Sequence, residues 1–486
     1  MATRTQIIRS LTAALLVLLT AGCKEFLAVN ENPNAPGSAR VEQTLPAVIT
    51  GFGHSVLSGS VALWSGEWMQ QFSYNGDTRA YSEIHRYEVT GLNTDWPWNA
   101  AYSTVMKEAR NIINETEASG DLAYHAIAKF LFAWSYGFLT DTWGPVPYRQ
   151  AFDVTIRNPE YDEQKTVYEG VHKQLEEAIV EMQKPAPRLP GANDLLFAGN
   201  MARWVKLART VQGQFHLRLA YAPGENRPER AQKAITALQQ GIASNAEDAD
   251  FAYPGKQTGW RQPWWTFEQI TQFLASEYYV ELLRGLNDPR LPITVRPALF
   301  DSVRGQIVYR GHKNGATAAL DSTVSRIAPY FSADSAALSW VSFAHVKFME
   351  AEARLILNDR AGADAAYRAG IQANMQKMRV PAAAITTYLA ARPSLTTVSN
   401  PLQEIITQKY IANFLKAEVW HDWRRTGYPR LQVVEGAMIP GIPQRLRAPA
   451  VEVAANIERV RATGISIGLG GRLTQVWWAT QGPPQF

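Results

Sequence analysis

The segment Leu122–Gly144, LAYHAIAKFLFAWSYGFLTDTWG, indicates the fold class of this chain. Its apolar and small side chains recur at spacings of three and four residues, at Ala123, Ile127, Phe130, Leu131, Trp134 and Phe138. This spacing puts them on one side of a helix with 3.6 residues per turn, so the segment is predicted to be a long core helix. The helix should end at Gly144, because Pro145 cannot continue it.

A second helical pattern precedes this one and is joined to it by a short polar link. In WNAAYSTVMKEARNIINE, residues 98–115, one face carries Tyr102, Val105, Met106, Ala109 and Ile112. The link, ASGD at 118–121, is short and polar and is suited to antiparallel packing. Trp98 and Tyr102 are four residues apart and are therefore expected to face the core. The two segments together predict a helical hairpin.

The same pattern recurs along the chain. TVYEGVHKQLEEAIVEM, residues 166–182, is followed by NMARWVKLARTVQGQFHLRLAY, residues 200–221. Residues 343–375, FAHVKFMEAEARLILNDRAGADAAYRAGIQANM, resemble a tetratricopeptide helix pair, with small residues where the helices approach and Tyr367 near the end. The predicted fold is therefore all-α, mainly helical: a tetratricopeptide-like helix-pair scaffold with long irregular loops and minor β-hairpins. The best hairpin candidate is GQIVYRGHK at 305–313.

Four long segments between these helices are expected to be irregular: Asn75–Pro97, Glu247–Trp265, Asp288–Thr323 and Pro429–Pro449. Connections of this length are uncommon in a compact domain unless they carry function. We therefore expect binding residues to lie there.

The N-terminus has the layout of a secretory signal. Arg4 and Arg9 precede an apolar run, Leu11–Leu19, which is too short to span a bilayer and is followed by small residues. Thr20-Ala21-Gly22-Cys23 resembles a bacterial lipobox, although Thr20 stands where leucine is commonest. The alternative is a buried structural cysteine. Because Cys23 is the only cysteine in the chain, no disulfide can form within it, and lipidation at Cys23 is favoured.

These features divide the chain into three parts. Residues 1–22 are the expected lipoprotein signal peptide, and 23–40 the lipidated tether, since Ala28–Arg40 is rich in Asn, Pro and Gly. Residues 41–486 are expected to form a single helical domain. Beyond Cys23 no uninterrupted apolar run reaches about 18 residues, so acyl chains would hold this domain at the outer membrane. Lys24-Glu25 looks like the charged tag of surface-exported lipoproteins, which favours a position facing the cell exterior.

Several function classes lack sequence support. The formal net charge of +4 comes from interspersed charges and gives no basic stripe for nucleic acid. GISIG at 464–468 matches a hydrolase pattern, but no histidine follows His421 as that pattern requires. The eight histidines have no metal-ligand spacing, and no phosphate-binding glycine loop or EF-hand loop is found. No cofactor, metal site or catalytic residue is predicted, and a calcium ion in the long loops stays open.

Glycoside hydrolysis remains an alternative, because it needs only two carboxylates in an aromatic groove. The candidates are Asp95, beside Trp96, and Glu268, Glu277 and Glu281. Glu277 and Glu281 have the ordinary spacing of a solvated helix face. A lipid-anchored glycoside hydrolase is therefore the second hypothesis.

Aromatic clusters give the better indication of function. The chain has 15 Trp, well above ordinary usage, and flat apolar rings are what sugars stack on. YPGKQTGWRQPWW places Tyr253, Trp260, Trp264 and Trp265 among Gly and Pro residues, and NTDWPW adds Trp96. These five are the predicted ligand-binding residues. The alternative for Trp264 and Trp265 is that they anchor the loop to the scaffold.

Several segments in order resemble one family. After the lipobox come FLAVNENPNAP, AIAKFLFAWSYGFLTDTWGPVPY, YDEQKTVYEGVHKQLEEAI, WVKLARTVQGQFHLRLA, NDPRLP, FMEAEARLI and EVWHDWRRTGYPRL. This order is similar to that of the SusD/RagB outer-membrane lipoproteins. IPQRLRAPAVEVAANIE fits the closing pattern, although Gln444 and Ala448 depart from it. In EVWHDWRRTGYPRL we expect Arg424 and Arg425 to bind helix-end carbonyls or carboxylates, with Trp420 and Trp423 packed beneath.

The resemblance implies a nutrient-binding role. It implies four tetratricopeptide-like helix pairs, a looped face that binds a glycan or other polymeric nutrient, and a partner, a TonB-dependent transporter of the SusC type. Ligand sites vary among such proteins, so no binding residue is transferred. A third hypothesis is a structural transporter subunit without a ligand, or one that handles peptides.

Overall fold

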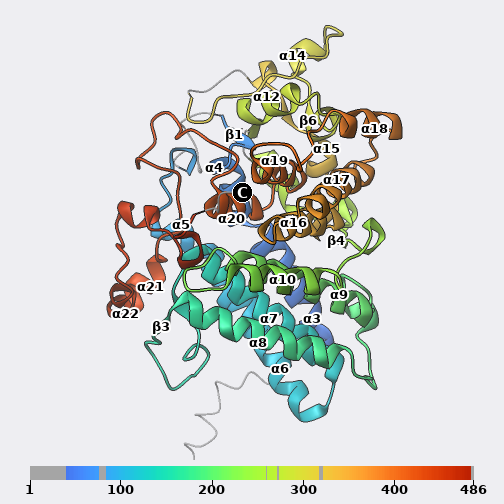
Figure 1. Ribbon diagram of the computed structural model, residues 1–486. Helices are drawn as coiled ribbons and strands as arrows, with labels where there is room; N and C mark the ends of the chain where they lie inside the picture. The colour runs from blue at the N-terminus through green and yellow to red at the C-terminus, as the bar shows by residue number, and fades with distance from the viewer. Residues whose placement is uncertain (1–39, 76–83, 259, 271–272, 317–320, 483–486) are drawn as a thin grey trace, which may run out of the picture.

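The computed structural model describes the chain except for residues 1–39, 76–83, 259, 271–272, 317–320 and 483–486 (Figure 1). The expected signal peptide and Cys23 lie outside the described residues, as does nearly all of the expected tether. The described chain is mainly helical, as predicted. One apolar core cluster contains side chains from Val41 to Ala479, and a second forms around the helices of residues 343–412.

The predicted long helix is α7 (Leu122–Trp143), which is buried over most of its length. It pairs with α6 (Lys107–Ser119), which continues from the π-helical turn η4 (Ala100–Met106). Gly120 ends α6 in the left-handed conformation, with a φ of +76°, where glycine is favoured. Trp98 is buried and its ring lies 4.7 Å from that of Tyr102, so the predicted hairpin and its core-facing pair are confirmed.

The next helices form a layer beside α7 in the lower half of Figure 1. They are α8 (Gln164–Met182), α9 (Met201–Leu219) and α10 (Arg227–Leu238). The predicted pair of α8 and α9 exists, but α8 packs mainly on α7, and α9 packs mainly on α10. The periodicity analysis did not identify α10. The chain stacks consecutive helices rather than isolated hairpins.

The tetratricopeptide-like segment forms α16 (Phe343–Ile356) and α17 (Arg360–Lys377), which pack closely against each other. A Cβ added at Gly370 would come within 3.0 Å of the Phe348 ring. The small residues of this pair therefore permit the close helix approach that the sequence predicts.

The remaining helices complete the scaffold and its loops. On the scaffold lie α3 (Val41–Gly51), α4 (Ser60–Trp68), α18 (Ala382–Ala390), α19 (Pro401–Ala412) and α20 (Glu418–Thr426). Inside or beside the long connections lie α5 (Gly91–Asn99), α11 (Pro263–Ile270), α12 (Glu277–Gly285), α13 (Leu291–Thr294), α14 (Leu299–Ser302), α15 (Pro329–Ser332), α21 (Ala450–Ala455) and α22 (Ile457–Ala462). The expectation of irregular structure is therefore wrong for Gly91–Pro97, where Thr90 and Asn93 form a capping box that starts α5.

The N-terminal helical stretch Val41–Trp68 is the described segment that is long and apolar enough to cross a membrane, with a mean hydropathy of 1.3 in its best window. It comprises α3, the π-helical turn η2 (Phe52–Leu57) and α4. Of the residues in that window, 61% are buried within the protein, as expected of a core helix.

Within the described residues the strands form four antiparallel pairs. They are β1 (Phe72–Tyr74) with β5 (Phe273–Ala275), β2 (Val146–Pro147) with β3 (Tyr161–Asp162), β4 (Ala249–Phe251) with β8 (Leu338–Val341), and β6 (Val295–Arg296) with β7 (Arg326–Ile327). GQIVYRGHK is not a hairpin: its regular pairing is one bridge between His312 and Ser276. Ile307 is 77% exposed, so the alternating pattern there has no core to cover.

Candidate functional site

A surface hollow of about 370 Å³ lies where four segments meet, and we call it the Trp96 hollow. Its lining comes from η2, the start of α4, α5 and α11: His54, Ser55, Gly59, Ser60, Trp64, Leu92, Asn93, Trp96, Pro263 and Phe267. Trp96 is 66% exposed, although tryptophan is on average well buried. The hollow therefore combines an open ring face with polar side chains.

Helix α5 positions Trp96 by turning it away from the core. Trp98, two residues later, points to the opposite side, where its ring lies 5.2 Å from that of Trp143. The cap fixes where α5 begins, because the Thr90 hydroxyl accepts from the backbone N–H of Asn93 at 3.3 Å. The Asn93 side-chain oxygen in turn accepts from the Thr90 backbone N–H at 2.8 Å. Trp96 is therefore carried by a helix whose first residue is defined by side-chain hydrogen bonds.

The other predicted aromatic residues lie on and around α11, with different exposures. Trp264 is 3% exposed and its ring lies 5.6 Å from that of Phe72, and Tyr253 is 5% exposed. Trp260 is 45% exposed, and Trp265 is half-buried with the Arg261 guanidinium 4.2 Å from its ring centre. Tyr253 and Trp264 thus lie beneath the outer surface, whereas Trp260 and Trp265 reach it.

The structure brings Trp96 and α11 to the same hollow, a proximity that their sequence positions do not reveal. The contributions of Pro263 and Phe267 from α11, and of His54 from η2, were not predicted. The Tyr253 hydroxyl lies 3.4 Å from Nδ1 of His54. Burial lowers the pKa of the His54 imidazole. The hollow therefore carries a neutral imidazole at pH 7, and no Asp, Glu, Lys or Arg side chain is among its described lining.

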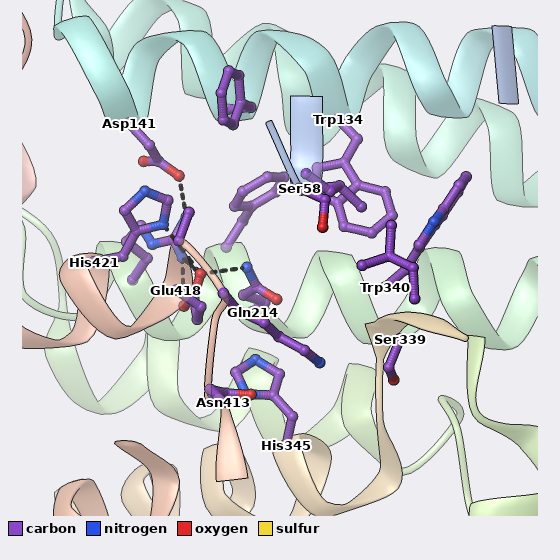
Figure 2. Close-up of a pocket in the computed structure, with 17 residues that line it drawn as sticks. Ser58, Trp134, Asp141, Gln214, Ser339, Trp340, His345, Asn413, Glu418 and His421 are labelled. Carbon is purple, nitrogen blue, oxygen red and sulfur yellow. Dashed lines mark hydrogen bonds and ion pairs between the residues drawn. The ribbon is translucent and has the colours of Figure 1, made fainter. Parts of the chain in front are cut away.

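A second polar group surrounds a smaller cavity of about 70 Å³, and we call it the Glu418 cluster (Figure 2). It comprises Asp141, Gln214, Arg218, Glu418 and His421, which come from α7, α9 and α20. Arg218 donates to the Glu418 carboxylate at 2.6 Å and also pairs with Asp141, and Gln214 donates to Glu418 at 3.1 Å. In Figure 2 the side chains of Asp141, Gln214 and His421 lie around Glu418.

The charges of the Glu418 cluster are mutually compensated. The positive charge of Arg218 and the hydrogen bond from His421 hold the pKa of Glu418 well below its usual value, despite burial. Burial lowers the pKa of His421. A buried ion pair with these partners ties three helices together and leaves little freedom for acid–base chemistry.

The segment EVWHDWRRTGYPRL belongs to the same buried region. Arg424 donates to the backbone carbonyl of Asp141 at 2.7 Å, in the last turn of α7, and its guanidinium lies 3.8 Å from the Trp420 ring centre. Arg425 donates to Glu352 at 3.0 Å. The predicted structural roles of the two arginines and of Trp420 are confirmed, and Trp423 is half-buried against the core.

Three of the four carboxylates considered for hydrolysis have other partners, and the fourth, Glu277, is exposed at the start of α12. Asp95 accepts from the backbone N–H of Val451 at 3.0 Å, at the start of α21. Glu268 pairs with Arg296 at 2.6 Å and with Arg326 at 3.0 Å. Glu281 pairs with Arg284 on the surface of α12.

The parts of the chain that the structure describes contain no group of three or more His, Cys, Asp or Glu side chains that could hold a metal ion.

Comparisons with known proteins agree with this architecture. The family model SusD-like_2, described as "Starch-binding associating with outer membrane", matches residues 40–449. A SusD/RagB family protein from Bacteroides thetaiotaomicron is similar in structure, with a TM-score of 0.79 at 21% identity over 91% of this chain and 99% of that one. A chitin-binding SusD homolog from Flavobacterium johnsoniae gives a TM-score of 0.78 at 21% identity, covering 92% of this chain and 100% of its own. No curated protein sequence matches the chain.

Proposed function

Because this chain belongs to the SusD-like family of starch-binding proteins that associate with the outer membrane, we propose that it captures an oligosaccharide at the cell surface and passes it to a transporter. In this proposal the ligand is bound and not transformed. The similar protein from Flavobacterium johnsoniae, whose name describes chitin binding, makes chito-oligosaccharides a reasonable first ligand, and the family description adds malto-oligosaccharides.

The observation that carries the proposal is the Trp96 hollow. An indole that is 66% exposed beside an opening of about 370 Å³ offers a flat apolar face for the C–H side of a sugar ring. Ser55, Ser60 and Asn93 supply neutral hydrogen-bonding groups around it. Neutral polar groups around an open aromatic face suit an uncharged glycan.

We assign the predicted aromatic residues two roles on the basis of their exposure. Trp96, Trp260 and Trp265 are proposed to contact the ligand, because part of each ring reaches the surface. Tyr253 and Trp264 are proposed to hold α11 and its preceding loop in place from below. Removing either of this second pair should weaken binding only by disturbing α11.

The anchor and the partner are further parts of the proposal. Acylation of Cys23 would hold the protein at the outer membrane facing outward, and a SusC-like TonB-dependent barrel would receive the ligand. Replacing Cys23 by Ala should release the protein from the membrane fraction. A tagged native protein purified in mild detergent should bring a TonB-dependent barrel with it. A wild-type protein without acyl chains would contradict the anchor.

The binding proposal is tested by calorimetric titration of the purified protein with chito- and malto-oligosaccharides. The Trp96→Ala variant should bind about fivefold more weakly, since an aromatic stack contributes on the order of 1 kcal/mol. Phe300→Ala is the matched control, because Phe300 is also an exposed aromatic, at 43%, but lies on α14 away from the hollow lining. Equal binding by both variants would exclude the hollow.

The same incubations distinguish binding from hydrolysis. Reducing ends released at catalytic rates would favour the glycoside hydrolase hypothesis and would refute a pure binder. Unchanged oligosaccharides that remain bound would support capture. Binding of none of the glycans tested would leave a structural subunit or a peptide binder as the better description.

A further inference from the structure

A cavity of about 200 Å³ borders a different face of α11 from the Trp96 hollow, and we call it the Lys416 cavity. Trp264 of α11 lines it, whereas Pro263 and Phe267 of the same helix line the hollow. Its other aromatic walls are Tyr330, Phe331 and Phe414. Tyr330 is 39% exposed, so the cavity has a side that is open to solvent.

Lys416 is the unusual residue of this cavity. It lines both this cavity and the one beside the Glu418 cluster, so it stands in the wall between them. Among the described residues, its ammonium has no hydrogen-bond or ion-pair partner. Burial lowers its pKa to about 8, with a further contribution from the charge of Lys377. Lys416 is half-buried, and a cation that is partly withdrawn from water without a partner is energetically costly.

Two other lysines of the interior, Lys377 and Lys409, have carboxylate partners. Lys377, which also lines the cavity, donates to Asp248 at 2.6 Å and to Asp250 at 2.8 Å. Lys409 donates to Asp422 at 2.8 Å. Lys416 is therefore an exception to the pattern of its own surroundings.

Two further polar groups of the cavity, Asn374 and Ser342, add free donors. The side-chain oxygen of Asn374 accepts from Arg290 at 2.8 Å, which leaves its amide N–H groups to donate. The Ser342 oxygen accepts from the backbone N–H of His345 at 3.3 Å, which leaves its hydroxyl proton to donate. The Asp250 carboxylate is engaged by Lys377. A ligand that fits these donors must bring acceptors of its own.

We propose that the Lys416 cavity binds a small organic acid, a single ring whose carboxylate accepts hydrogen bonds from the Lys416 ammonium while the ring packs against Trp264 and Phe414. A cavity of about 150 Å³ accommodates benzene, so about 200 Å³ is suited to one substituted ring and is below the range of drug-sized pockets. The acid is either an acidic sugar, such as a uronic acid, or a free aromatic acid, and both share the ring and the carboxylate.

The test is calorimetric titration of the purified protein with galacturonate and with benzoate, each beside its uncharged counterpart, galactose and benzyl alcohol. At least one acid should bind, with an affinity about tenfold or more above that of its uncharged counterpart. The reason is that only the acid can form a charge-assisted hydrogen bond with Lys416. Binding of galacturonate alone would identify an acidic sugar, and binding of benzoate alone an aromatic acid. If neither acid binds at millimolar concentration, or if the uncharged counterparts bind equally well, the proposal is wrong.

A variant locates the binding. Lys416→Met keeps the length of the side chain and removes the charge, so it should weaken acid binding about tenfold or more while leaving galactose or benzyl alcohol unaffected. Lys313→Met is the matched control, because Lys313 is a surface lysine that lines neither cavity. Trp96→Ala should also leave acid binding unchanged, which keeps this test separate from that of the hollow. Equal affinity in the wild type and Lys416→Met would overturn the assignment.

A measurement on the wild type covers the case in which Lys416→Met does not fold. Benzoate affinity should fall as the pH is raised from 7 to 9, because Lys416 loses its proton near pH 8. The other charged groups around it are Lys377, Asp248, Asp250 and Glu418, and the two aspartates and Lys377 form ion pairs with each other. Affinity that stays constant across this range would contradict the role of Lys416.

Discussion

The Glu418 cluster and the Trp96 hollow differ in whether their polar and aromatic side chains find partners within the protein. In the cluster, Arg218 lies between two carboxylates and the Trp478 indole donates to Asp141 at 2.8 Å. In the hollow, Trp96 has no aromatic or cationic partner among the described residues and is 66% exposed. Interactions that are complete within the protein indicate a structural role, whereas the open ring of Trp96 is the basis of the ligand surface that we propose.

The largest expected effect is in the cluster. Arg218→Met removes the cation that Asp141 and Glu418 share, so two buried carboxylates lose their compensation. The free energy of unfolding should fall by about 3–5 kcal/mol, as measured by urea denaturation. Arg284→Met is the control, because its ion pair with Glu281 is on the surface, and its cost should be below about 1 kcal/mol. Similar small losses in both variants would show that the cluster is not a structural centre.

The second expected effect is a gain in stability. It concerns Lys416, which stands between the Lys416 cavity and the cavity beside the Glu418 cluster. The pKa of Lys416 is lowered from 10.5 to about 8, so the folded state disfavours its charge, and this cost is fully present below pH 8. Lys416→Met should therefore be more stable than the wild type at pH 7, by up to about 3 kcal/mol. The difference should shrink as the pH rises from 8 towards 10.5. Denaturation curves of both proteins at several pH values measure it, and a difference that does not change with pH would refute the assigned cause.

The third prediction concerns the hollow. Trp96→Ala should reduce oligosaccharide affinity by about fivefold but change the free energy of unfolding by less than about 0.5 kcal/mol, because an exposed side chain contributes little to stability. Titration calorimetry and thermal unfolding of the same preparation measure both. A marked loss of stability would place Trp96 with the structural tryptophans of the cluster.

The smallest effect should come from the cap of α5. Thr90→Ala removes the hydroxyl that accepts from Asn93, which should cost about 1 kcal/mol of stability. Oligosaccharide affinity should fall about twofold, since the start of the helix that carries Trp96 becomes less well defined. Thr386→Ala on exposed α18 is a suitable control, because its hydroxyl donates within the helix and does not cap it. An unchanged affinity with reduced stability would show that α5 orients Trp96 without this cap.

The fold was predictable where helices carry periodic apolar faces. This holds for α7 and for the pair α16 and α17, and the arginines of α20 were correctly expected to bind a helix-end carbonyl and a carboxylate. Helix α10 was missed, and the hairpin at 305–313 was wrong because alternation alone does not provide a core for the strand to cover. The hollow could be anticipated only in part: Trp96 was named from its local sequence, but its proximity to α11 and η2 depends on tertiary packing.

Helix α11 contributes side chains to both sites: Pro263 and Phe267 line the hollow, and Trp264 lines the Lys416 cavity. A ligand that displaces this helix from either side changes the shape that the opposite side presents. Thermodynamic reciprocity then requires that a glycan and an acid alter each other's dissociation constant by the same factor, whichever binds first. One short helix would in this way make uptake of one nutrient responsive to the concentration of another.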